Sequence, residues 1–343
     1  MSKWQWAWEG VLGLVTVLGV VMVLLTAPDG HLLNILALSA PSGLVAVGLS
    51  LSLRTGTPNL AVGSVSALSG ALIASLVTVA RLPLIVALLL VLLLAGIAGL
   101  VMGAFTVLLS APSWAVTVAA AAVCDALLFA VAQGRAVILA DPLVVPPVVG
   151  FVAFAVVSVA GGLVWKWRDL RHWLSKEWVG PLAGLAGSCV LAALGGFLLL
   201  LRLGAAQPGS QGLSAVVFAL AAVVLGGASL SGKRGSPAPT SVPGAVGPGE
   251  RVAVGPGERG ADGLGAVGPG ERGAGGLGAV GPGAIAYGDR GAIGGTVFAV
   301  VILGIVQGQL ALLGAPFYLT LIVLGGVVIS GLTVSRALDA LRT

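Results

Sequence analysis

Charged side chains are scarce in this chain. Only 8% of its 343 residues are Asp, Glu, Lys or Arg, whereas a soluble domain carries about a quarter. This scarcity excludes a surface that faces water on all sides. Hydrophobic residues make up 58% of the sequence, and apolar runs of about 20 residues, long enough to cross a bilayer, recur along most of its length. The sequence therefore predicts an all-α, polytopic membrane protein.

Histidine and cysteine are almost absent, with two of each. Cys124 and Cys189 fall in separate apolar segments, a pattern typical of neither a disulfide framework nor a metal site. His31 lies beside an expected external loop and His172 in a Trp-rich cytoplasmic stretch. No Ser/His/Asp or His/Cys cluster can be assembled from these positions. No catalytic residue, metal site or cofactor is predicted.

One stretch imitates a phosphate-binding loop. Gly227 is followed five residues later by Gly232 and then Lys233, but Arg234 stands where Ser or Thr should bind magnesium. An apolar helix is expected before this stretch, where a nucleotide-binding loop follows a strand. The sequence does not predict nucleotide binding.

The apolar segments set the expected topology. With the N-terminus in the cytoplasm, 14 of the 17 basic residues fall inside and only Arg81, Arg135 and Arg202 outside. This asymmetry satisfies the positive-inside rule, and it places both termini in the cytoplasm. The ten predicted membrane helices cover residues 11–27, 32–53, 59–80, 84–110, 114–133, 148–165, 179–201, 213–230, 291–311 and 316–335.

A Gly/Pro-rich insertion divides the membrane domain. We expect residues 1–231 to form its first part, 232–290 a low-complexity cytoplasmic loop, and 291–343 its last two helices. The motif Val-Gly-Pro-Gly recurs in the loop, but the glycines keep no three-residue period, which excludes a collagen helix. The loop has too few large apolar side chains to offset its ordering entropy. It is expected to be flexible and rich in turns.

Five sequence elements carry a resemblance to a known family. They are Asn59–Gly70 (NLAVGSVSALSG), Ala111–Thr117 (APSWAVT), Arg202–Gly209 (RLGAAQPG), Val224–Ser236 (VLGGASLSGKRGS) and Gly295–Gly314. In this order they resemble the ribose-type, or simple-sugar, permeases of ABC importers, a group related to the branched-chain amino-acid permeases. The elements span nearly the whole membrane domain.

The resemblance implies a helical channel half in the bacterial plasma membrane. Such a subunit forms a homo- or heterodimer with a second permease copy, pairs with cytosolic ABC ATPases that hydrolyse ATP, and receives solute from an extracytoplasmic binding protein. The chain itself is not expected to be an enzyme. The expected solute is small and polar, with a sugar first. An amino-acid or nucleoside permease, or a degenerate permease acting as a membrane scaffold, are the alternatives.

The resemblance also suggests an ATPase-coupling segment. Small residues would allow close backbone approach, and two basic side chains supply charge; the alternative is a turn whose basic residues merely fix topology. A similar sequence recurs at Gly288–Ala292, so either copy would complete the loop if the repeat were excised. The predicted segment comprises Ser229, Leu230, Ser231, Gly232, Lys233, Arg234 and Gly235.

Polar residues within the apolar segments are candidates for the solute pathway. Asn59 replaces the family's usual aspartate, and Asp125 stands where an arginine is common. Asp125 would face the pathway or pair across the dimer, or else lie near a helix end and reach water. Gln307 and Gln309 would bond a polyhydroxyl solute or neighbouring helices. The candidates are Asn59, Ser64, Ser66, Asp125, Gln307 and Gln309.

Overall fold

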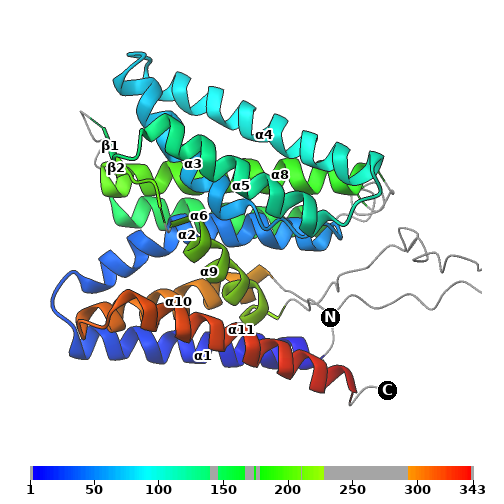
Figure 1. Ribbon diagram of the computed structural model, residues 1–343. Coiled ribbons are helices and arrows are strands. Elements are labelled where there is room, and N and C mark those ends of the chain that lie inside the picture. Colours follow the sequence, from blue (N-terminus) through cyan, green and yellow to red (C-terminus); the bar gives the residue numbers. More distant parts are fainter. Residues whose placement is uncertain are drawn as a thin grey trace, which may run out of the picture. The chain divides into compact units, whose positions relative to one another are not determined.

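The computed structural model describes residues 3–139, 146–166, 174, 178–209, 211–227 and 293–340. These residues form ten helices and one two-stranded ribbon, all in a compact unit built from residues 1–233 and 284–343 (Figure 1). The helices are α1 (Lys3–Thr26), α2 (His31–Arg54), α3 (Val62–Thr78), α4 (Leu84–Leu108), α5 (Ser113–Ala132), α6 (Pro147–Lys166), α8 (Val179–Leu203), α9 (Gln211–Leu225), α10 (Ile293–Leu312) and α11 (Phe317–Ala340).

The predicted all-α, polytopic membrane fold is confirmed. Six of the described helices are long and apolar enough to cross a membrane, and the other four carry shorter apolar stretches: Val62–Thr78, Pro147–Leu163, Gly212–Leu225 and Phe317–Thr333. Each of the ten apolar segments corresponds to one helix. The first turn of α1 and the last turns of α11 lie at the same end of the unit (Figure 1).

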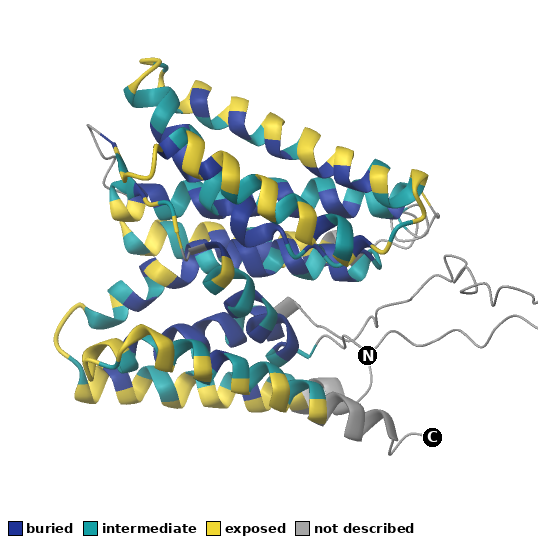
Figure 2. Ribbon diagram, in the orientation of Figure 1, coloured by how far each residue is buried: buried dark blue, intermediate teal, exposed yellow. Residues whose placement is uncertain are grey.

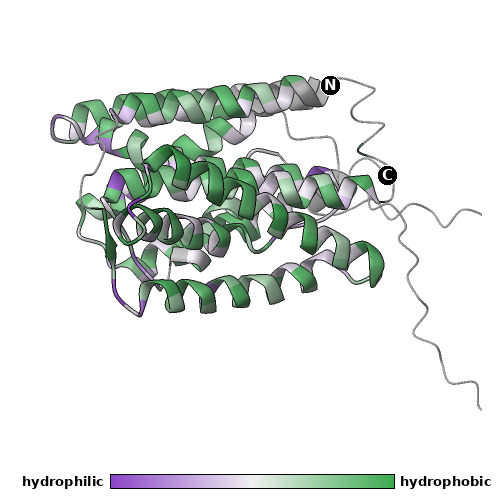
Figure 3. Cartoon of the chain, turned by 90° about the horizontal axis from the view of Figure 1, so that it is seen from above, coloured by the Kyte–Doolittle hydropathy of each residue, from purple (hydrophilic) through white to green (hydrophobic). Residues whose placement is uncertain are grey.

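Helices α2 and α8 form the centre of the unit. They pack on each other and on α3, and 61% and 56% of their most apolar stretches are buried. By contrast, α1, α4 and α5 are only 11%, 22% and 17% buried by the same measure, and their exposed faces are apolar (Figures 2 and 3). Such faces suit contact with lipid, because a helix that is apolar all round needs no water-facing side.

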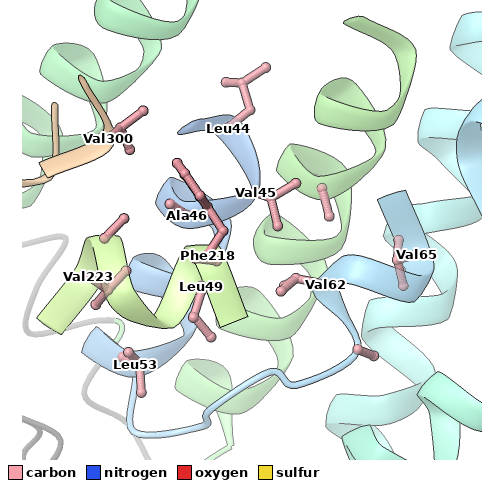
Figure 4. Close-up of a cluster of buried hydrophobic side chains, with 14 of the residues drawn as sticks. Leu44, Val45, Ala46, Leu49, Leu53, Val62, Val65, Phe218, Val223 and Val300 are labelled. Atoms are coloured by element: carbon pink, nitrogen blue, oxygen red, sulfur yellow. The ribbon is translucent and has the colours of Figure 1, made fainter. Parts of the chain in front are cut away.

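The main core gathers side chains from distant parts of the chain. Leu49 of α2, Val62 of α3, Phe218 of α9 and Val300 of α10 are all within 2% of complete burial and lie in one cluster (Figure 4). Alanine and glycine between these larger residues let the helix backbones approach closely. The cluster therefore ties α9 and α10 to the two central helices.

Two connections pair at the end of the unit opposite the termini. Strand β1 (Val137–Ile138) runs antiparallel to β2 (Ala205–Ala206), and the Leu139 amide donates to the Gly204 carbonyl at 2.8 Å. The sequence predicts that both connections are extracytoplasmic. The pairing of β1 with β2 agrees with the prediction that the two connections lie on the same side of the membrane.

Candidate translocation site

The chain between α2 and α3 is not helical, although it lies within the bundle. Backbone groups at membrane depth need hydrogen-bond partners, since no water is there to supply them. Side chains provide these partners. The Asn59 amide donates to Ser52 Oγ (3.1 Å), the Leu60 amide to Thr117 Oγ1 (3.2 Å), and the Ala61 amide to Asn59 Oδ1 (3.0 Å). We call residues 55–61 the α2–α3 break.

The Asn59 side chain joins this break to the middle of α8. Its Nδ2 group donates to Ser188 Oγ at 2.6 Å and to Cys189 Sγ at 3.4 Å. Asn59 and Ser188 are both completely buried. Ser188 lies nine residues into the 25-residue α8, so the break reaches well into the bundle. Contact between Asn59 and a solute requires these hydrogen bonds to open.

Thr117 holds the same break from α5. Its hydroxyl is completely buried, accepts the Leu60 bond and donates to the Ser113 carbonyl of its own helix at 2.9 Å. Sequence reasoning selected neither Thr117 nor Ser188. Two sequence features could have identified them: Thr117 belongs to the Ala111–Thr117 element, and Ser188 is the lone serine of the apolar α8.

The first turns of α3 and α9 meet beside the break. A Cβ on Gly63 would collide with the carbonyl oxygen of Gly212, so both chains approach as backbone. A Cβ on Gly212 would lie 3.1 Å from Ser64 Oγ and 3.4 Å from Asp125 Oδ1. Helix N-termini carry partial positive charge, which favours a nearby carboxylate. We call Gly63, Ser64, Asp125 and Gly212 the helix-start junction.

Asp125 lies inside α5 and not at its end. Six residues separate it from Ala132, the last residue of the helix, and it is half-buried with its carboxylate beside α9. Among the other acidic residues that the structure describes, Glu9 is near the start of α1, Asp29 is in a connection and Asp339 is in the last turn of α11. Asp125 is thus the described acid placed deep within a membrane helix.

Ser66 lies two residues after Ser64 on α3, and its backbone packs on α8. A Cβ on Gly196 would collide with the Ser66 carbonyl oxygen, and a Cβ on Gly70 would lie 3.2 Å from the Gly196 carbonyl oxygen. Ser64 and Ser66 are 4% and 5% exposed. The structure therefore brings Asn59, Ser64 and Asp125 to one region, with Ser66 at its edge.

Gln307 and Gln309 lie elsewhere, on α10. The glycine between them packs on α2: a Cβ on Gly308 would lie 2.7 Å from Ile35 Cγ1 and 3.3 Å from His31 Nε2. Ile35 precedes Ser52 by 17 residues, about 25 Å along a helix. Gln309 Nε2 is buried without a hydrogen-bond partner among the described residues. The two glutamines thus form a group separate from the break.

The predicted coupling segment, Ser229 to Gly235, lies outside the described residues, and so does the whole predicted loop at 232–290. The helix ends that flank this stretch are described. A Cβ on Gly226, just after α9, would lie 3.0 Å from both the carbonyl carbon of Gly295 and the amide nitrogen of Thr296 in α10. The chain therefore leaves and re-enters the bundle at adjacent points.

Comparison with known proteins gives one match. Residues 31–169 match the model of a family described as the permease component of branched-chain amino acid transport systems. The matched stretch runs from the first residue of α2 to just beyond α6, and it includes the break, Thr117 and Asp125. No curated protein and no solved structure matches the chain. From α2 to α6 the chain is thus similar to transport permeases.

Proposed function

We propose that this chain is the membrane-spanning permease subunit of an ABC importer in a bacterial plasma membrane. The family match over α2 to α6 carries the proposal, and the confirmed polytopic fold agrees with it. Three of the five resembling elements begin at Arg202, Val224 and Gly295. They extend the likeness beyond the matched stretch and into α8, α9 and α10.

In this account the chain performs no chemistry itself. A partner ATPase hydrolyses ATP and acts on the segment from Ser229 to Gly235, an extracytoplasmic binding protein delivers the solute, and a second permease copy completes the channel. The α2–α3 break and the helix-start junction are where a solute would meet polar groups. Discontinuous helices that begin at mid-membrane are a recurrent design of transporter binding sites.

Two solute classes have specific support. A sugar fits the likeness to simple-sugar permeases, because hydroxyl and amide groups such as Ser64 and Asn59 can bond a polyhydroxyl compound. An amino acid fits the description of the matching family, and its ammonium group would pair with the Asp125 carboxylate. We put the sugar first, with the amino acid, a nucleoside and loss of transport as alternatives.

Co-purification tests the ATPase partnership. The chain is co-expressed with an ABC ATPase encoded in the same operon, and the tagged chain is isolated in mild detergent. We expect the ATPase to co-purify with the unmodified chain but not with the double variant Lys233→Glu plus Arg234→Glu. The matched control is Arg251→Glu plus Arg259→Glu, which reverses two basic residues of the repeat outside both copies of the loop sequence. An operon without an ABC ATPase, or no association with the unmodified chain, would contradict the proposed function.

A further inference from the structure

Helix α1 is the least buried of the six long apolar helices, yet it makes one directed contact with α9. Only 11% of its most apolar stretch is buried, but the Trp8 indole Nε1 donates to the carbonyl oxygen of Leu225 at 3.0 Å. Leu225 is the last residue of α9. The final carbonyls of a helix lack partners within it, and Trp8 supplies one.

Two further helices hold the same end of α9. Gly226 meets Gly295 of α10 backbone to backbone, as described above. On α11, a Cβ on Gly331 would lie 3.5 Å from the Cβ of Val224 and would collide with its Cγ1 methyl group. Residues 224–226 are therefore held by α1, α10 and α11 together. We call Trp8, Gly295 and Gly331 the α9 clamp.

The clamp lies directly before the predicted coupling segment. Gly227 has φ +91°, a left-handed conformation that ends the helix, and Ser229 follows two residues later. Gly226 and Gly295 contact each other through backbone atoms, so no side chain between α9 and α10 can rotate to absorb a shift. A displacement that reaches the end of α9 must therefore move its neighbours or break the clamp.

We infer that Trp8 is a positioning residue for coupling: its indole N–H holds the end of α9 on α1, so that movement of the end of α9 is passed to α1, α10 and α11. The role of Trp8 in coupling rests on the proposed function, because it presupposes a partner ATPase. The contact itself does not depend on it. A tryptophan near a helix end also serves as an interfacial membrane anchor, and the test must separate the two roles.

Three matched variants separate them. Trp8→Phe keeps an aromatic ring at the interface and removes the N–H donor. Trp4→Phe and Trp6→Phe make the same change in the preceding turn of α1. An anchoring role predicts similar effects from all three, whereas positioning predicts an effect of Trp8→Phe alone. Trp8→Tyr, another interfacial aromatic residue without the indole N–H, serves as the second variant if Trp8→Phe fails to fold.

The first measurement needs neither ATPase nor solute. A nitroxide label is attached to Ser229→Cys in the full chain, with Cys124→Ala and Cys189→Ser removing the native thiols, and its spectrum is recorded in lipid nanodiscs. We expect Trp8→Phe to raise the ratio of mobile to immobilised label about fivefold, the effect of losing one typical hydrogen bond. Trp4→Phe and Trp6→Phe should leave the ratio unchanged. An unchanged ratio in Trp8→Phe, or an equal rise in all three, would overturn the inference.

The second measurement uses the assembled transporter. ATP hydrolysis, followed as phosphate release, and ATP-driven uptake are recorded together. We expect Trp8→Phe to lower the amount of solute moved per ATP severalfold while KM for uptake stays the same. Normal coupling in Trp8→Phe would sink the inference and leave the proposed function intact. If the unmodified chain binds no ATPase, the proposed function fails, and the label still tests the clamp.

Discussion

Asn59 donates a 2.6 Å hydrogen bond to Ser188 Oγ, and this bond ties the non-helical α2–α3 break to α8. Both residues are completely buried. The same asparagine accepts from the Ala61 amide, so one side chain supports the break at two points. A broken helix inside a bundle is stable only when such bonds are made.

Asn59→Leu should therefore destabilise the fold. It leaves the buried Ala61 amide without its acceptor and removes the bond to Ser188, whose hydroxyl keeps its own bond to the Leu185 carbonyl. An unmet buried polar group costs about 1–3 kcal/mol. Thermal unfolding in detergent measures the change. The control is Asn34→Leu, which removes an exposed hydrogen bond between Arg202 and Asn34. Equal losses of melting temperature in the two variants would contradict a special role for Asn59.

The contact between α3 and α9 should reject any side chain. Gly63→Ala places its Cβ against the Gly212 carbonyl, a backbone atom that cannot rotate away. Overpacking of this kind costs about 1–3 kcal/mol or more. We expect a lower yield of folded protein in gel filtration. Gly325→Ala in α11 is the control, because nothing lies within 4 Å of the added methyl group; a similar loss there would mean that helical glycines matter for another reason.

Excision of the repeat should leave the bundle folded. Because Gly226 and Gly295 already touch, the helices need no long connection, and a shorter loop loses less entropy on closure, by about 2 kcal/mol. Deletion of 236–291 keeps Lys233 and Arg234, while deletion of 233–288 keeps Asp289 and Arg290 instead. Both should unfold cooperatively, at or above the melting temperature of the full chain. A cooperative unfolding transition that disappears in both would show that the repeat belongs to the folded core.

Asp125→Asn tests the helix-start junction in transport. Removing the charge takes away its attraction to the first turns of α3 and α9, worth up to about 2 kcal/mol. We expect ATP-driven uptake to fall about tenfold, which corresponds to about 1.4 kcal/mol. Asp29→Asn, in the connection after α1, should transport normally. Unaltered uptake in Asp125→Asn would remove this residue from the pathway.

Hydropathy alone predicted the helices well, because long apolar runs leave few alternatives in a membrane. It failed at the break and at the end of α9, where the predicted segment runs to residue 230 and the helix ends at Leu225. Residues 59–61 are Asn-Leu-Ala and look as apolar as the helix that follows, so the predicted segment began at 59, whereas α3 begins at Val62. What stops the helix is the set of bonds from Ser52, Thr117 and Ser188. These partners are distant in sequence, and only the fold brings them together.

The sequence predicted individual residues of the candidate site but not their proximity, because the fold brings together partners that are distant in sequence. The Asn59–Gly70 element singled out Asn59 and Ser64, and an acid in an apolar helix singled out Asp125. Their proximity depends on Gly63 and Gly212 allowing two helix starts to meet, which no single segment reveals. Gln307 and Gln309 were grouped with them by family likeness, and the structure places the glycine between them against the first turns of α2.

ATP-driven uptake tests the central claim most directly. We would reconstitute the chain in proteoliposomes with the ATPase and the binding protein of its operon. ATP is supplied on the side of the membrane where the ATPase is bound. Radiolabelled ribose, leucine and a nucleoside are offered in turn, with an ATPase-inactive variant as the blank. The account predicts ATP-dependent accumulation of one of these classes, with the sugar first. Association of all three proteins without accumulation of any class would contradict an importer and support a membrane scaffold.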